Sequence, residues 1–353
     1  MINNQKESDE RTFHQKNENK SNIFKKIIPG ILISIVIIAI LLWKTDFHVL
    51  AKTFKNASLK LILVVFVLQS VAFVFRGLAW RIILEKLPTK VQCFWTIAEG
   101  YLLNLLPLRL GEIGRAVIMG NIIKKSAFYV FSTVILERLF DVIVTLLMLI
   151  GTIPLLAGAE FSSRSYYILF TIIIICFVLL VIIVKHKDKF INLLSKIFRP
   201  ETKAGSFIIS KTESLLSGMN ILLEPKKLVI WLIWILLTWA CWIFTFIFEM
   251  KTFFPELPLW ASFFTQSLGA LGGAIPSAPA GIGVIEGAYV VALRFFGIGQ
   301  SEALAFGLFS HGMGIITPVI WGIIGFTIQG QNIMEVFKNI QKTDLSQEDK
   351  KNE

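Results

Sequence analysis

The charged residues most suited to ligand chemistry lie around a proline inside an apolar stretch, in the pattern N-x-x-P-x-R-x-G-E-x-x-R from Asn104 to Arg115. Glu112 and Arg115 are three residues apart, so they share one face of a helix. A helix that restarts after Pro107 presents free N–H groups, which favour an anion. Arginine forks bind phosphate through paired hydrogen bonds. The pattern predicts a site for a phosphate-bearing group, with Asn104, Arg109, Glu112 and Arg115 as candidates.

Two plainer interpretations of this segment stay open. In a binding site, Glu112 would hold one arginine in place or carry a proton, whereas in the first plainer interpretation Glu112 and Arg115 form an ion pair that only neutralises two buried charges. Alternatively, the segment lies at the level of the lipid headgroups, where arginine is common. Charges at membrane depth are costly and usually functional, which favours a binding site.

A second apolar stretch carries a similar break, P-x-G-x-G-x-x-E from Pro279 to Glu286. Glu286 lies about one turn into the helix that restarts there, and the next basic residue is Arg294. We expect Glu286 either to pair with an arginine of the first stretch or to titrate during a transport cycle. A helix cap or a structural hydrogen bond is the plainer alternative.

Three further charges lie in the middle of another apolar run, at Glu137, Arg138 and Asp141. Glu137 and Asp141 share a helical face, and Arg138 can reach Asp141 three residues on. A mid-span cluster should face the protein interior, where it either touches substrate or locks two helices together. His311 in the last apolar run is interpreted as a packed or hydrogen-bonded histidine rather than a proton shuttle.

The remaining polar side chains in apolar runs are expected near the membrane surface. Arg76 and Arg81 should extend their charged ends toward the headgroups. Glu99 and Glu249 are placed near an interface. Tryptophans at predicted span ends fit an interfacial belt: Trp43, Trp80, Trp95, Trp231 and Trp260.

The composition defines the class of protein that must position these residues. Of 353 residues, 55% are apolar and 17% are charged, against about 25% charged in ordinary soluble domains. The formal net charge is +11. This composition excludes a soluble enzyme, a disordered chain and the usual basic nucleic-acid-binding domain. The sequence has no P-loop, metal-ligand cluster or nucleophile elbow, so we expect no cofactor and no metal.

The apolar runs predict an all-α polytopic membrane protein with six full transmembrane helices. Their predicted ranges are 27–43, 61–75, 127–156, 165–184, 228–248 and 303–329. Residues 92–123 and 257–297 are apolar but broken by proline and glycine, which disrupt a helix. Broken backbone is tolerated at membrane depth only inside protein or beside water. Both segments are therefore predicted to be re-entrant helical hairpins within a transmembrane domain spanning 27–330.

Charge sets the predicted orientation. The connection 185–227 is rich in lysine and arginine, which marks it as cytoplasmic. Both polar tails, 1–26 and 331–353, then also lie in the cytoplasm of a multi-pass cell-membrane protein. The segment from Lys44 to Lys60 conflicts with this topology, because its four lysines would lie outside.

The predicted topology contains an inverted repeat. A span, a hairpin and a span run from 61 to 156, and the same trio runs upside down from 228 to 329. Glu112 and Glu137 are 25 residues apart, as are Glu286 and His311. Inverted repeats with broken helices are typical of secondary transporters, whose site lies where the breaks meet.

Two motifs, 104–115 and 279–286, and the run from Ile135 to Asp141 resemble the lysylphosphatidylglycerol-synthase transmembrane (flippase-like) family. The resemblance covers residues 27–329. It implies movement of lipids or lipid-linked headgroups between leaflets. Some family members carry a C-terminal transferase domain that attaches lysine to phosphatidylglycerol. The sequence ends at Glu353, soon after the last span, so the resemblance implies the translocase half.

The expected function is thus a flippase or scramblase for a polar, anionic lipid headgroup, with the lipid bilayer as its partner and no nucleic acid. The alternatives are a phosphatidylglycerol lysyltransferase, acting alone or with a separate transferase partner, an ion-coupled small-solute transporter, and a membrane scaffold. In the expected mechanism, Arg109, Glu112, Arg115 and Glu286 form one site, supported by Arg138 and Asp141.

Overall fold

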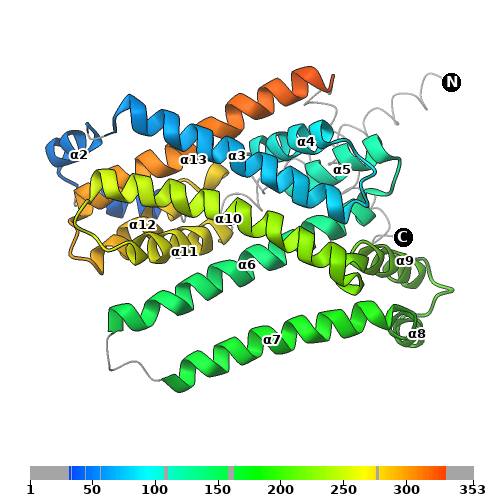
Figure 1. Ribbon diagram of the computed structural model, residues 1–353. Coiled ribbons are helices and arrows are strands. Elements are labelled where there is room, and N and C mark those ends of the chain that lie inside the picture. Colours follow the sequence, from blue (N-terminus) through cyan, green and yellow to red (C-terminus); the bar gives the residue numbers. More distant parts are fainter. Residues whose placement is uncertain are drawn as a thin grey trace, which may run out of the picture.

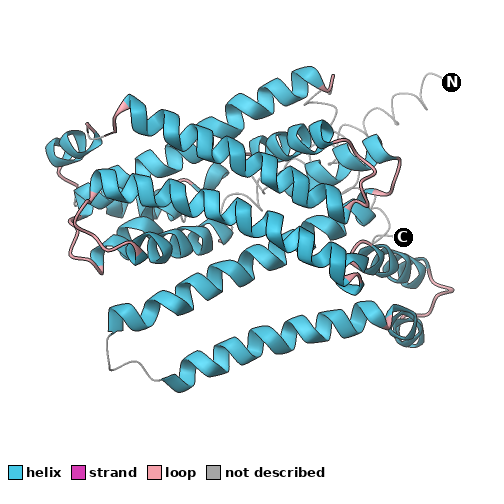
Figure 2. Ribbon diagram, viewed as in Figure 1, coloured by secondary structure: helices cyan, strands magenta, loops and turns pink. Residues whose placement is uncertain are grey.

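The computed structural model describes residues 32, 34–43, 45–55, 57–106, 110–157, 163–275 and 278–330. Within these ranges the chain forms helices and no strands, and short loops connect most of them (Figure 2). After the helix Ser34–Trp43, the elements are α2 (Phe47–Phe54), α3 (Leu59–Ile83), α4 (Lys90–Leu103), α5 (Gly111–Ile123), α6 (Ala127–Ala157), α7 (Ser163–Lys185), α8 (Lys187–Ile197), α9 (Lys203–Ser217), η3 (Asn220–Leu223), α10 (Pro225–Phe253), α11 (Trp260–Ala274), η4 (Pro279–Gly281), α12 (Val284–Arg294) and α13 (Gln300–Ile328).

Four helices, α3, α6, α10 and α13, are long and apolar enough to cross a membrane. Two further candidates are bent pairs. The helix Ser34–Trp43 turns by 98° into α2, and α7 turns by 86° into α8. Counting each pair as one span gives up to six, so the predicted number is the upper limit. The tails 1–26 and 331–353 lie outside the described residues.

The lysine-rich segment after Trp43 contains a helix that the sequence analysis did not predict. Asp46 caps α2, because its carboxylate accepts hydrogen bonds from the N–H groups of His48 and Val49. The N–H of Asp46 donates to the hydroxyl of Ser301 at the start of α13. This contact fixes α2 beside the first turn of α13.

Both predicted broken segments fold as two helices separated by a break. In the first, α4 packs against α5, and the N–H of Gly111 donates to the side-chain oxygen of Asn104 across the break. A side chain on Gly111 would overlap the carbonyl oxygen of Gly100, so glycine is required for this approach. In the second, α11 packs against α12, with Gly272 beside Ala288.

The long helices pack in a pattern that links the two halves of the chain (Figure 1). α3 lies along α10, α4 packs against α13, and α6 packs against α11. α7 lies at the edge of the molecule (Figure 1). Its exposed side chains are almost all apolar: Ile168, Phe170, Ile172, Ile174, Ile175, Val178, Leu179 and Ile182. Such a surface fits contact with a lipid bilayer.

Candidate functional site

Arg76 on α3, rather than an arginine of the first broken segment, contacts two of the carboxylates in the middle of α6. Its Nη1 and Nη2 donate to Oδ1 and Oδ2 of Asp141, each at 2.7 Å. Its Nε lies 3.5 Å from Oε1 of Glu137. The prediction that Arg76 extends to the headgroups is therefore wrong, because its side chain is 0% exposed and paired inside the protein. The general rule that charges within spans face partners already favoured this outcome.

Arg115 on α5 pairs with Glu137 on α6, not with Glu112 in its own helix. Its Nη2 donates to Oε2 of Glu137 at 2.8 Å, and its guanidinium lies 4.2 Å from the ring of Trp80. The alternative that Arg115 pairs with Glu112 is therefore wrong, and Arg115 instead joins α5 to α6. The Trp80 indole, predicted for an interfacial belt, is instead fully buried and donates to Thr133.

Glu112 pairs with Arg138, whose Nε lies 2.8 Å from Oε1 of the carboxylate. Arg138 also donates from Nη1 to Oδ2 of Asp141 at 3.2 Å, which confirms the predicted contact three residues apart. Trp239 of α10 donates its indole N–H to Asp141 at 3.1 Å. Asp141 therefore joins α3, α6 and α10.

We call these six residues the arginine–carboxylate cluster: Arg76, Glu112, Arg115, Glu137, Arg138 and Asp141. Its three arginines and three carboxylates balance in charge. Arg76, Arg115 and Glu137 are buried, whereas the side chains of Glu112 and Arg138 are 33% and 31% exposed. Among the described residues, the cluster is therefore most open to its surroundings along the Glu112–Arg138 edge, while the Asp141 side chain is 12% exposed.

Arg115 has spare hydrogen-bonding capacity. Its side chain is 1% exposed, yet Nε and Nη1 have no hydrogen-bond partner among the described residues. A buried guanidinium normally satisfies its donors, because an unpaired donor costs about 1–3 kcal/mol. The Nε and Nη1 groups lie on different edges of the guanidinium, so each can donate a hydrogen bond to an oxygen of an anion beside Arg115.

The other two candidates of the first motif have different outcomes. Asn104 closes the break by accepting the N–H of Gly111 at 3.0 Å, so its side-chain oxygen is already in use. Arg109 lies outside the described residues, as do Pro107 and Leu108. Arg109 therefore stays a prediction.

Glu286 and His311 form a second group, on α12 and α13. Oε1 of Glu286 lies 2.7 Å from Nδ1 of His311, and Oε2 accepts the N–H of Gly283 at 2.7 Å. Nε2 of His311 lies 3.0 Å from the carbonyl oxygen of Ala280. His311 is thus hydrogen-bonded, and Glu286 is a helix cap as well as an ion-pair partner.

The local sequence explains this geometry. Ala280, Gly281 and Gly283 all have positive φ, at 58°, 79° and 87°. Glycine adopts such angles without strain. The resulting turn points the Ala280 carbonyl at His311 and starts α12 with Glu286 in its first turn.

The structure brings the predicted site residues together in two groups rather than one. The described contacts of Glu286 are with His311 and Gly283, and none is with Arg115. A single joint site remains a prediction.

Two further carboxylates, Glu99 and Glu249, are both 0% exposed within the protein. Their predicted position near a membrane interface stays a prediction. Glu99 accepts a hydrogen bond from Gln329 at 3.1 Å. Glu249 lies beside the hydroxyl of Ser310, but neither of its oxygens has a hydrogen bond of regular geometry within the described structure.

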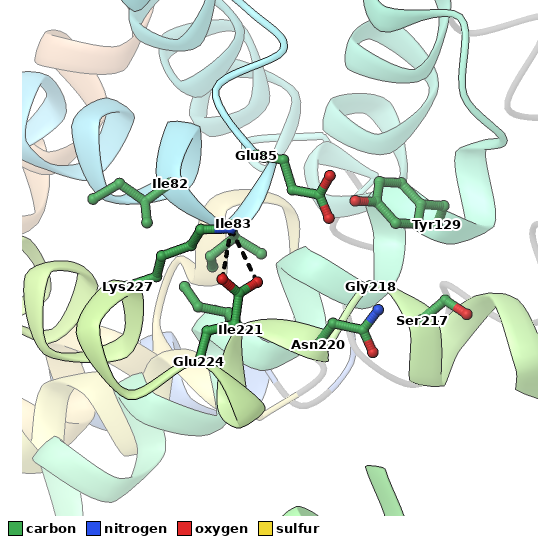
Figure 3. A pocket seen from close by; sticks show the side chains of 10 residues that line it. All are labelled: Ile82, Ile83, Glu85, Tyr129, Ser217, Gly218, Asn220, Ile221, Glu224 and Lys227. Carbon is green, nitrogen blue, oxygen red and sulfur yellow. Dashed lines mark hydrogen bonds and ion pairs between the residues drawn. The ribbon is translucent and has the colours of Figure 1, made fainter. Parts of the chain in front are cut away.

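A small pocket lies where α3, α6, η3 and α10 meet, and Figure 3 shows its lining. Lys227 and Glu224 form an exposed ion pair there, 2.7 Å apart. Such exposed pairs hold little energy. No residue of the arginine–carboxylate cluster lines this pocket. Among the described residues, no three histidine, cysteine or acidic side chains gather as a metal site.

Comparison with known proteins gives the chain a family. The model of the lysylphosphatidylglycerol synthase TM region matches residues 27–322. The UPF0104 membrane protein MJ1078 of Methanocaldococcus jannaschii is 27% identical over 244 residues, which cover 67% of this chain and 97% of that protein. The UPF0104 membrane protein MJ1595 of the same organism is 22% identical over 335 residues, which cover 88% of this chain and 96% of that protein. No solved structure matches. The chain belongs to the lysylphosphatidylglycerol synthase TM region family, as its two broken-helix motifs predicted.

Proposed function

We propose that the protein is a lipid translocase, a flippase or scramblase that moves a polar, anionic phospholipid or lipid-linked headgroup between leaflets. The observation that carries this proposal is the state of Arg115. Two of its donors have no partner among the described residues, although the side chain is almost fully buried in a membrane protein. A phosphate supplies the oxygen acceptors that these donors lack.

The exposed edge of the cluster supports a route to Arg115. Glu112 and Arg138 are about one-third exposed, and both belong to the helices that hold Arg115 and its partner Glu137. Exchange of Arg138 from Glu112 to an incoming phosphate would open the cluster without leaving an unpaired arginine. The acyl chains would stay in lipid, because the neighbouring helices expose apolar side chains.

The proposed transmembrane arrangement has six spans and two re-entrant hairpins, α4–α5 and α11–α12, related as an inverted repeat. The packing supports this symmetry, since the contact of α4 with α13 and the contact of α11 with α6 both join the two halves and correspond to each other under the repeat. Glu112 with Arg138 and Glu286 with His311 then occupy corresponding places, each linking a hairpin to the following span. We propose a location in the cell membrane, with the basic connection 185–227 and both termini in the cytoplasm.

The test is leaflet exchange of a fluorescent phosphatidylglycerol in vesicles that hold the purified full-length protein. Arg115→Lys keeps the positive charge for Glu137 but removes the two unpaired guanidinium donors, so we expect exchange to fall about tenfold or more, as expected for loss of a hydrogen bond to a charged group worth about 1.5–3 kcal/mol. Arg109→Gln should also slow exchange. Lys227→Gln, in the exposed pair beside the small pocket, is the matched control and should exchange normally.

Unchanged exchange in both Arg115→Lys and Arg109→Gln would remove the proposed headgroup site. Lipid extracts from cells that express the chain alone provide a second readout. Lysyl-phosphatidylglycerol in those extracts would favour the enzyme alternative over the translocase.

A further inference from the structure

A second set of ionisable side chains lies in the C-terminal half, where α10, α12 and α13 meet. Glu249 comes from α10, Glu286 and Tyr289 come from α12, and His311 comes from α13. The hydroxyl of Ser310 lies near Glu249 and Tyr289, although no hydrogen bond of regular geometry reaches Glu249. Glu286, the partner of His311, is about one turn from Tyr289 on α12. The set therefore extends from Glu249 through Ser310 and Tyr289 to the Glu286–His311 pair.

Close packing holds this set together. The ring of Phe246, one turn from Glu249, lies 5.5 Å from the Tyr289 ring. Gly269 of α11 leaves the space that the Tyr289 ring occupies. Gly307 of α13 lies beside the backbone of Glu286. All four titratable side chains are buried, and Glu249 is 0% exposed.

This set differs from the arginine–carboxylate cluster because its described ion pairs include no lysine or arginine. Other ionisable side chains on the surrounding helices are bound elsewhere or exposed. Arg76 pairs with Asp141, and Glu99 accepts a hydrogen bond from Gln329. Lys251 donates to two backbone carbonyls, and Glu302 accepts the N–H of Gly299. Lys52 and Arg294 are exposed.

The hydrogen-bonding needs of His311 and Glu249 indicate that these side chains bind protons. Both ring nitrogens of His311 face oxygen acceptors, and a neutral imidazole has only one N–H. The carboxyl group of Glu249 is buried with neither a cation nor a regular hydrogen bond among the described residues. An ionised carboxylate in such a place costs several kcal/mol. A second N–H on the His311 ring would satisfy both of its oxygen neighbours, and a proton on Glu249 would remove the charge from its buried carboxyl group.

We propose that Glu249, Tyr289, Glu286 and His311 form a proton-binding site that couples proton movement to transport. The proton adds to a carboxylate oxygen of Glu249 and passes along the hydroxyls of Ser310 and Tyr289 to the Glu286–His311 pair. The charge of the set rises by one when the proton binds. This inference rests on the proposed function, because one proton moving with one singly charged anionic lipid makes transfer electroneutral.

Proton binding is tested on the purified full-length protein by infrared spectroscopy of its carboxyl groups across a pH titration. We expect a protonated-carboxyl absorption that is lost in Glu249→Gln and restored in Glu249→Asp. Glu302→Gln, which removes a carboxylate at the start of α13, should keep the absorption. The same absorption in the wild type and in Glu249→Gln would overturn the proposal.

Coupling is tested in the vesicles used for lipid exchange, with an imposed pH gradient. One proton per lipid predicts that a gradient of about one pH unit changes the leaflet ratio of phosphatidylglycerol about tenfold, because that gradient is worth about 1.4 kcal/mol. Glu249→Gln should abolish this change. A parallel experiment imposes a sodium gradient in place of the pH gradient. A leaflet ratio that responds to the sodium gradient and not to the pH gradient would overturn the proposal that protons are the coupling ion.

The two proposals fail in different ways. Exchange that does not respond to the pH gradient would overturn coupling and leave the translocase intact. Loss of the carboxyl absorption in Glu249→Gln, with no lipid exchange in the wild type, would establish the proton site and overturn the translocase.

Discussion

At the residue scale, the arginine–carboxylate cluster is an example of buried charges that depend on one another. Removing both charges of a buried ion pair is often tolerated, whereas removing one leaves an uncompensated charge. Arg76 makes two 2.7 Å hydrogen bonds to Asp141, so this pair should show the effect most clearly.

We therefore expect Arg76→Met to lower the free energy of unfolding by about 3–5 kcal/mol. The double substitution with Asp141→Leu should cost less than the sum of the two single changes, because neither charge is then left alone. Unfolding in mild detergent, titrated with a denaturing detergent, measures these changes. Lys227→Met, in an exposed ion pair, is the control and should cause no measurable change. Additive costs would show that the pair is not coupled.

Individual residues also show where sequence reasoning reached its limit. The contact of Arg138 with Asp141 could be predicted because both lie on one helix, three residues apart. The partners of Arg76, Arg115 and Glu286 could not be predicted, because each partner lies on a different helix. Nothing local distinguishes a paired charge from one that reaches the headgroups.

At the element scale, proline and glycine determined the breaks that the sequence analysis found. The break before α12 needs three residues at positive φ, two of which are glycine. The break before α5 needs Gly111 for close approach to α4. These are local requirements, so they are visible in the sequence.

Gly111→Ala tests the close approach directly. The added methyl group would overlap the Gly100 carbonyl and the Asn104 side chain. Overpacking of this kind costs about 1–3 kcal/mol, so we expect a lower unfolding temperature and slower lipid exchange.

Gly151→Ala on α6 is the matched control, since nothing lies within 4 Å of its added methyl group. It should stabilise the helix by about 0.5–1 kcal/mol. Equal unfolding temperatures for the two variants would show that α4 and α5 do not need this contact.

At the scale of the whole molecule, the packing shows where the lysines that conflict with the predicted topology lie. α2 carries Lys52 and lies beside the start of α13 through the Asp46–Ser301 hydrogen bond. The ring of Trp260 at the start of α11 lies 5.0 Å from Phe296, just before α13. α2 and the loop before α11 therefore lie at the same end of the molecule, away from α8 and α9 (Figure 1).

Single cysteines test the proposed orientation in a background without Cys93, Cys176 and Cys241. Cysteines at Lys52 and Glu256 should react with a membrane-impermeant reagent added outside intact cells. A cysteine at Glu201, in the basic connection, should react only after the cells are opened. Reaction of the Lys52 and Glu201 positions from the same side would contradict the topology.

The sequence by itself determined the class of fold, the positions of the apolar helices, the two breaks and the family. These features depend on the transfer of side chains from water and on local backbone preferences, and both are properties of short segments. Only the tertiary structure decided which charges meet. It joined Arg76 to Asp141 and Arg115 to Glu137, and it gave Glu286 a histidine in place of an arginine. Such pairs depend on which helix faces lie together, and helix packing brings together residues that are far apart in the chain.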